Sequence, residues 1–189
     1  MNFRSIIFLF LPCLFLFACG EKAPGQTPEE ARKVENDPAA PEGLVTLSDI
    51  PLYGNFADMQ KIFRYRNDTT YVINFWATWC KPCVEELPFF EDLHEKFPNE
   101  KLKVILVSLD FPNKLEEKLV PFINENKLKS DVVVLLDGDY NNWIDQVNSD
   151  WDGAIPVTHI YRNETSEFVG RAFTDAKELS DMTATFLRK

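Results

Sequence analysis

The chain has 189 residues, of which 45% are hydrophobic and 13% aromatic, which is enough for one well-buried domain and little for two. Its formal net charge of −10 at pH 7 argues against nucleic-acid binding, which needs a basic surface. The same charge argues against electrostatic adhesion to anionic lipid, so membrane attachment would depend on acyl chains.

The N-terminal segment has the composition of a secretory signal. Residues 1–18 carry one charge, that of Arg4, followed by an apolar stretch over residues 6–17 that is too short to predict a membrane span. The sequence Leu-Phe-Ala-Cys that ends at Cys19 resembles the lipobox of bacterial lipoproteins, in which cleavage precedes a cysteine that is then acylated. We therefore expect a lipoprotein-type signal peptide over residues 1–18 and a lipid anchor on Cys19.

A linker is expected over residues 19–43. Beyond the cysteine it is rich in Pro, Glu, Ala and Lys and almost lacks large apolar residues, which is typical of a solvated segment. As a flexible coil it would span roughly 25–30 Å, and it would tether a folded domain over residues 44–189. Because Cys13 would leave with the signal and Cys19 would carry lipid, Cys80 and Cys83 would remain as thiols.

The domain begins with an extended segment and a helix. Residues 44–52 have the pattern of a weakly paired extended segment, and residues 56–66 place apolar side chains on one helical face. A buried strand is predicted over the apolar run Tyr71–Ala77, which ends at the sequence Trp-Cys-Lys-Pro-Cys, residues 79–83. A helical pattern follows over residues 84–97.

The Cys-x-x-Cys pair at this strand-to-helix junction predicts a dithiol that cycles with a disulfide. Two intervening residues in a first helical turn bring the sulfurs close enough to bond. Unpaired N–H groups and the helix dipole favour a thiolate at Cys80, and Lys81 adds a positive charge beside it. Cys80 is therefore the expected nucleophile, and Cys83 the residue that resolves a mixed disulfide. The alternatives are a static disulfide and half of a zinc site, although zinc needs about four ligands.

The rest of the chain alternates strands and helices. Apolar, β-branched runs at residues 102–109 and 132–136 are separated by helical patterns, which predicts parallel strands with crossover helices. The expected helices cover residues 114–126, residues 140–147 with Tyr140, Trp143, Ile144 and Val147 buried, and a last segment from Leu179. Residues 156–161 and 167–173 are predicted to be antiparallel strands joined by a turn.

Two segments carry a resemblance to a known family. Residues 74–88, Asn-Phe-Trp-Ala-Thr-Trp-Cys-Lys-Pro-Cys-Val-Glu-Glu-Leu-Pro, and residues 154–158, Ala-Ile-Pro-Val-Thr, resemble thioredoxin-fold proteins, and more narrowly the TlpA/ResA-like branch of envelope-tethered thiol:disulfide oxidoreductases. The resemblance implies an α/β, thioredoxin-like fold with a central mixed sheet flanked by helices. It also implies that the helix–strand unit between Leu109 and Trp151 is the central insertion of that branch.

The resemblance also implies a substrate-binding edge beside the dithiol. In the family, the proline that Pro156 matches follows a cis peptide and lies against the sulfurs. Ile155 would then offer backbone groups to an extended partner segment, next to the active-site turn formed by Lys81 and Pro82. The alternative for Pro156 is an ordinary proline at the start of a strand. Trp79, with Trp76, could form a partner-facing patch, although Trp76 could equally be core.

Glu86 is a candidate for proton transfer. Thioredoxins in general have a buried Asp where this chain has Asn74, and an amide cannot exchange protons. In the TlpA/ResA-like branch an acidic residue three positions after the second cysteine is thought to serve instead, and Glu86 stands there. Helical spacing puts it on the face of Cys83. A solvated surface carboxylate is an equal alternative. His94 and His159 are expected to be core or rim residues, and no metal site is expected.

Together these observations favour a lipid-anchored oxidoreductase of the bacterial cell envelope, with its domain on the extracytoplasmic side. It would need no bound cofactor and would take electrons from an upstream dithiol protein. In an oxidising envelope its expected role is to reduce partner-protein disulfides, for example those of apocytochrome c. The rival functions are a thiol peroxidase and a copper-delivery protein of the same fold.

Overall fold

The computed structural model describes residues 45–47 and 49–188. The expected signal peptide, the linker and Cys19 lie outside the described residues. Within the described part of the chain, no helix combines the length and the apolar character that crossing a membrane requires.

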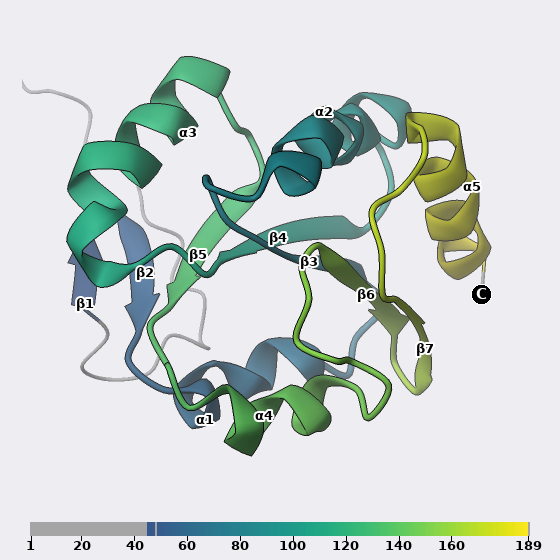
Figure 1. Ribbon diagram of the computed structural model, residues 1–189. Coiled ribbons are helices and arrows are strands. Elements are labelled where there is room, and N and C mark those ends of the chain that lie inside the picture. The colour runs from purple at the N-terminus through teal and green to yellow at the C-terminus, as the bar shows by residue number, and fades with distance from the viewer. Residues whose placement is uncertain (1–44, 48, 189) are drawn as a thin grey trace, which may run out of the picture. The chain divides into compact units, whose positions relative to one another are not determined.

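Seven strands form one mixed sheet in the order β1-β2-β5-β4-β3-β6-β7 (Figure 1). Strands β2, β5, β4 and β3 run parallel to one another, whereas β1, β6 and β7 pair antiparallel with their neighbours. The bounds are β1 (Val45–Leu47), β2 (Ile50–Tyr53), β3 (Thr70–Trp76), β4 (Leu102–Ser108), β5 (Asp131–Leu135), β6 (Val157–Arg162) and β7 (Thr165–Val169).

Helices cover both faces of this sheet. Helices α2, α3 and α5 lie on one face, and α1 and α4 lie on the other (Figure 1). The bounds are α1 (Phe56–Met59), the 3-10 helix η1 (Gln60–Phe63), α2 (Lys81–Lys96), the 3-10 turn η2 (Pro112–Lys114), the π-helical turn η3 (Leu115–Leu119), α3 (Val120–Asn126), α4 (Tyr140–Val147) and α5 (Ala176–Leu187). The α/β arrangement expected from the sequence is confirmed.

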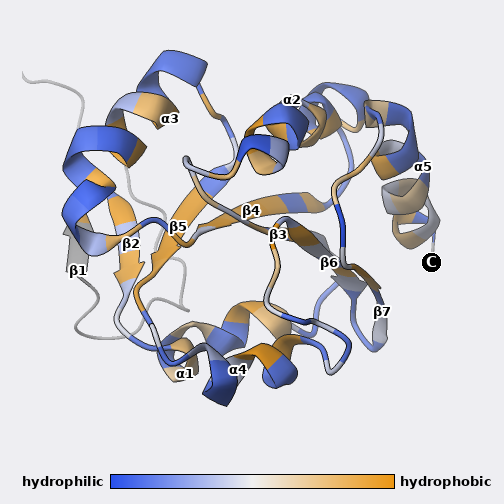
Figure 2. Cartoon of the chain, in the orientation of Figure 1, coloured by the Kyte–Doolittle hydropathy of each residue, from blue (hydrophilic) through white to orange (hydrophobic). Residues whose placement is uncertain are grey.

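Strand β3 is the centre of the fold, because all of its residues are buried. Val72 and Trp76 point into the core beneath α2 and α5, whereas Ile73 and Phe75 point into the core beneath α1 and α4. A strand that is buried on both faces is expected to be apolar throughout. In Figure 2 the central strands are mostly hydrophobic, while the helices show hydrophilic residues among hydrophobic ones. Thr70 and Asn74 are the buried polar exceptions in β3.

The helix–strand unit between β4 and α4 adds a strand to the sheet, since β5 lies between β4 and β2. The single helix predicted over residues 114–126 is replaced by η2, η3 and α3 in succession. The N–H of Val120 donates to the carbonyl of Leu115, five residues back. Pro121 follows, and a proline has no N–H and its ring crowds the preceding turn. The wider π-helical turn before Pro121 accommodates it.

Several sequence-based predictions differ from the structure: Ile144, expected to be buried, is only half-buried, and the last strand begins at Thr165 rather than at residue 167. The helix expected over residues 56–66 ends at Phe63 and is half 3-10. The burial of Tyr140 was predicted wrongly: at the first position of α4 its side chain stays exposed, although its ring lies 5.7 Å from that of Trp143. The last strand ends at Val169 rather than at residue 173, because the N–H of Phe173 donates to a side chain of α2 instead of to the sheet.

Candidate active site

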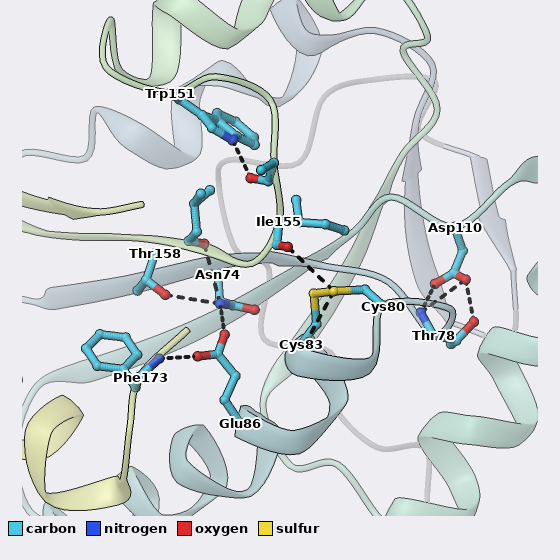
Figure 3. Close-up of a disulfide and its surroundings, with 12 residues drawn as sticks. Asn74, Thr78, Cys80, Cys83, Glu86, Asp110, Trp151, Ile155, Thr158 and Phe173 are labelled. Atoms are coloured by element: carbon cyan, nitrogen blue, oxygen red, sulfur yellow. Dashed lines mark hydrogen bonds between the residues drawn. A yellow bond between two sulfur atoms is a disulfide. The ribbon is translucent and has the colours of Figure 1, made fainter. Parts of the chain in front are cut away.

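The Cys80–Cys83 pair lies where β3 passes into α2 and forms a disulfide (Figure 3). Cys80 is the N-cap of α2, and its Sγ accepts a hydrogen bond from the N–H of Cys83 at 3.4 Å. Pro82 occupies the first turn of the helix, where its missing N–H costs nothing. Cys83 is fully buried and Cys80 nearly so. Lys81 is exposed and pairs with Glu85 at 3.6 Å.

The loop before β6 covers the disulfide. The Ile155–Pro156 peptide is cis, as the resemblance implied. The carbonyl oxygen of Ile155 lies 3.7 Å from the Sγ of Cys80. The indole N–H of Trp151 donates to the carbonyl of Ala154 at 2.7 Å and fixes this loop from the opposite face of the sheet (Figure 3).

Asp110 holds the turn that precedes Cys80, a role that the sequence analysis missed. Its carboxylate accepts from the N–H of Thr78 at 3.1 and 3.2 Å and from the Thr78 hydroxyl at 2.5 Å. The hydroxyl of Ser108 donates to the same carboxylate at 2.8 Å. Asp110 follows β4 and Thr78 follows β3, and the carboxyl ends of adjacent parallel strands meet at one edge. That topology was the signal available in the sequence.

Glu86 is 1% exposed, so the alternative of a solvated surface carboxylate is wrong, and its role in proton transfer stays a prediction. It shares the buried face of α2 with Cys83. One carboxylate oxygen accepts from the Nδ2 of Asn74 at 3.0 Å, and the other accepts from the N–H of Phe173 at 2.8 Å. Burial raises the pKa of Glu86 to about 7, although these hydrogen bonds favour the charged form and hold the pKa down in part.

The tryptophans beside the dithiol have separate places. Trp76 is fully buried and packs against Phe122 with ring centroids 5.4 Å apart, so it is a core residue. Trp79 is 56% exposed and stacks on Phe111, which is 55% exposed, with ring centroids 5.9 Å apart. The two rings form an exposed aromatic pair next to the active-site turn. Sequence analysis found Trp79 and missed Phe111.

Both histidines contact other side chains of the protein. The Nε2 of His94 lies 3.0 Å from the hydroxyl of Ser130. The ring of His159 contacts those of Phe63 and Tyr161, and burial lowers the pKa of His159 to about 4. Among residues 45–47 and 49–188, His, Cys, Asp and Glu side chains do not gather in groups of three or more that could hold a metal ion.

This geometry gives the sulfurs different chemistry. Cys80 lies at the helix N-terminus beside the edge formed by Ile155, where backbone N–H groups stabilise a thiolate. Cys83 is enclosed behind it, on the same helix face as a carboxylate that titrates near neutral pH. The arrangement suits a disulfide exchange in which Cys80 attacks first and Cys83 must lose a proton before it attacks.

Comparisons with known proteins identify a family model and several relatives. The model of the AhpC/TSA family matches residues 56–165, more than half of the chain. Sporulation thiol-disulfide oxidoreductase A of Bacillus subtilis is 32% identical over 63 residues, 33% of this chain and 38% of that protein. Thiol-disulfide oxidoreductase ResA of Oceanobacillus iheyensis is 44% identical over 39 residues, 21% of this chain and 20% of that protein. The chain therefore matches well under half of the length of these relatives.

Solved structures agree with the fold. A thioredoxin-related protein from Neisseria meningitidis serogroup B superimposes with a TM-score of 0.53 at 17% identity, covering 64% of this chain and 86% of that one. A thiol:disulfide interchange protein from Chlorobium tepidum, of the thioredoxin family, gives a TM-score of 0.52 at 17% identity, covering 64% and 81%. The fold is therefore thioredoxin-like.

Proposed function

This chain belongs to the AhpC/TSA family, and we propose that it is a thiol:disulfide oxidoreductase that reduces disulfides of partner proteins through Cys80 and Cys83. The observation that carries the proposal is the Cys80–Cys83 disulfide at the N-terminus of α2, with one sulfur beside the Ile155 carbonyl and the other enclosed. Two relatives with local similarity to this chain bear the name thiol-disulfide oxidoreductase.

The reaction begins from the dithiol form. The Cys80 thiolate attacks one sulfur of the partner disulfide, and the other partner sulfur leaves as a thiolate that takes up a proton. Cys83 then loses its proton and attacks the Sγ of Cys80, which releases the second partner sulfur. Two electrons and two protons pass to the partner, and the Cys80–Cys83 disulfide is restored. A second dithiol protein must supply electrons for the next cycle.

Glu86 is the proposed acceptor for the Cys83 proton. A general base works best when its pKa lies near the working pH, and burial places the pKa of Glu86 at about 7. The N–H of Phe173 and the Nδ2 of Asn74 fix both carboxylate oxygens on the buried side of α2. The carboxylate is therefore held in place before the thiol ionises.

Partner proteins would bind along the edge at Ile155. Its carbonyl oxygen already lies beside the attacking sulfur, and an extended partner segment could pair with this backbone as a short strand does. Because position 156 is a proline, no metal-binding or bulkier side chain from this position reaches the sulfurs. Trp79 offers an exposed apolar surface next to the same turn.

The proposed location is the bacterial cell envelope, with the domain tethered on the extracytoplasmic side by a lipid on Cys19. The lipobox-like sequence and the polar linker support this location. In an oxidising compartment a protein with this dithiol is useful as a dedicated reductant, and the cysteines of apocytochrome c are one suitable class of substrate.

Dithiothreitol-driven reduction of insulin tests the activity. Wild-type protein should accelerate the reduction, and Cys80→Ser should abolish the acceleration. Glu85→Gln is the control variant, because Glu85 lies on the same helix and is exposed. It should accelerate the reduction as the wild-type protein does. Parallel incubations with hydrogen peroxide and with Cu(I) test the peroxidase and copper-delivery alternatives. Wild-type protein that acts no faster than Cys80→Ser, or that turns over peroxide instead, would contradict the proposal.

A further inference from the structure

Asn74 is a polar residue in the middle of the most buried strand. Its side chain lies on the face of β3 that α2 covers, between those of Val72 and Trp76. The Nδ2 donates to Glu86 and to the hydroxyl of Thr158, both at 3.0 Å, and lies 3.4 Å from the carbonyl oxygen of Val157. The Oδ1 is buried and accepts no hydrogen bond from the residues that the structure describes.

The surroundings fix which side of the amide carries the oxygen. The carbonyl of Val157 can only accept a hydrogen bond at any pH, whereas the carboxyl of Glu86 is limited to accepting in its ionised form. A reversed amide would place its oxygen against the Val157 carbonyl and the ionised Glu86 carboxylate, and remove the hydrogen bonds that Nδ2 donates to them. The nitrogen must therefore face Glu86 and Val157. The oxygen then points toward Cys83, as Figure 3 shows.

An unpartnered buried carbonyl oxygen is unusual and unfavourable in a folded protein. In the disulfide form, neither the Oδ1 of Asn74 nor the Sγ of Cys83 carries a proton, so no hydrogen bond can join them. Reduction of the disulfide places a proton on Cys83. A thiol is a weak donor, and the acceptor it needs is already in place.

We propose that Asn74 is a positioning residue for the resolving thiol, and that in the dithiol form the S–H of Cys83 donates a hydrogen bond to the Oδ1 of Asn74. This inference rests on the proposed function only in that the Cys80–Cys83 pair must cycle between disulfide and dithiol. It gives a role to the amide that stands where a proton-exchanging side chain would otherwise be expected.

The hydrogen bond has two consequences. It stabilises the neutral thiol relative to the thiolate and so raises the pKa of Cys83. It also stabilises the dithiol relative to the disulfide, because only the dithiol satisfies the buried oxygen. The same amide holds Glu86 through its nitrogen, so Asn74 fixes both the thiol and the carboxylate that receives its proton.

A spectroscopic test addresses the hydrogen bond directly. In the full-length chain with Cys13→Ser, Cys19→Ser and Cys80→Ala, Cys83 is the sole thiol, and its Raman S–H stretching band moves to lower frequency when the thiol donates. We expect a hydrogen-bonded band with Asn74, a free-thiol band with Asn74→Leu, and a hydrogen-bonded band with Asn74→Asp, which retains an acceptor. An unchanged band in Asn74→Leu would overturn the proposal. Should that variant fail to fold, Asn74→Ala makes the same comparison.

The thiol–disulfide equilibrium with dithiothreitol provides a second test, in the full-length chain with Cys13→Ser and Cys19→Ser only. Asn74→Leu should shift the equilibrium toward the disulfide by about tenfold, which for this two-electron couple is about 30 mV. Thr158→Val is the control, because it removes a partner of Nδ2 and leaves Oδ1 in place; it should change the equilibrium less than about twofold. An equal shift in both variants would refute the role of Oδ1.

Neither measurement uses a partner protein. A chain that reduces no insulin but shows the S–H shift would contradict the proposed function and leave the hydrogen bond intact. A chain that reduces insulin without the shift would contradict the hydrogen bond alone.

Discussion

Replacement of Glu86 by glutamine should remove a pH-dependent loss of stability. In the folded protein Glu86 stays protonated up to about pH 7, whereas in the unfolded chain it ionises near its ordinary pKa of 4.5. Its contribution to the free energy of unfolding is therefore fully present below pH 4.5 and is lost as the pH rises through 7. At about 1.4 kcal/mol per pH unit between these two pKa values, the loss is about 3 kcal/mol.

Urea unfolding of the oxidised protein between pH 4 and pH 8 measures this loss, because the disulfide keeps Cys80 and Cys83 from titrating. The difference in free energy of unfolding between wild type and Glu86→Gln should change by about 3 kcal/mol across the range. A constant offset is expected in addition, since the glutamine amide cannot accept from both Asn74 and Phe173. Glu85→Gln should leave the pH dependence unchanged. A difference between wild type and Glu86→Gln that is flat with pH would refute the burial argument.

The same substitution tests the catalytic proposal separately. Without a carboxylate to accept the Cys83 proton, reduction of a model disulfide should be slower near neutral pH, and the pH–rate profile should change over pH 5–9, which stopped-flow kinetics can measure. The fold and the ability to form the Cys80–Cys83 disulfide should remain. Superimposable profiles for the two proteins would leave Glu86 with a structural role only.

Three further predictions concern the other residues of the site and the tether. Cys83→Ser should accumulate mixed disulfides with partner proteins on non-reducing gels and Cys80→Ser should not, because only Cys80 lies at the helix N-terminus; equal trapping by both would reverse the assignment. Cys19→Ser should leave the membrane fraction or keep its signal uncleaved, and a processed, unacylated variant that stays in that fraction would count against the lipoprotein. Asp110→Asn should lower the free energy of unfolding in urea by about 2 kcal/mol, because one amide oxygen cannot replace two carboxylate oxygens that bind Thr78; a change below about 0.5 kcal/mol would show that water satisfies the turn.

Local patterns were enough to predict the reactive pair. The apolar run before Cys80 and the helical spacing after Cys83 fix a strand-to-helix junction, and the structure has β3 and α2 there. The span predicted for α4, residues 140–147, is also the observed one. These predictions depend on neighbours within a few residues, so the sequence contains all that they require.

Long-range pairings decided what the sequence left open. The pattern of α2 could not say whether Glu86 faces solvent or core. A carboxylate is stable in the core only where hydrogen-bond donors satisfy it, and the helical pattern does not reveal those donors. Those partners are Asn74 and the N–H of Phe173, 12 and 87 residues away. Asp110 was missed for the same reason, since its partner Thr78 is 32 residues away.

The buried polar groups divide into two sets around the sulfurs. Asp110 fixes the turn that presents Cys80, whereas Asn74 and Glu86 lie on the side of Cys83. Each set places a carboxylate in the interior, which is unfavourable unless donors satisfy it. Apolar side chains of similar volume would often stabilise the fold as well as these residues do, or better. In the proposed mechanism, their separation keeps Cys80 reactive at the helix N-terminus while Cys83 stays a thiol until it resolves the mixed disulfide, which is the asymmetry that a two-step exchange requires.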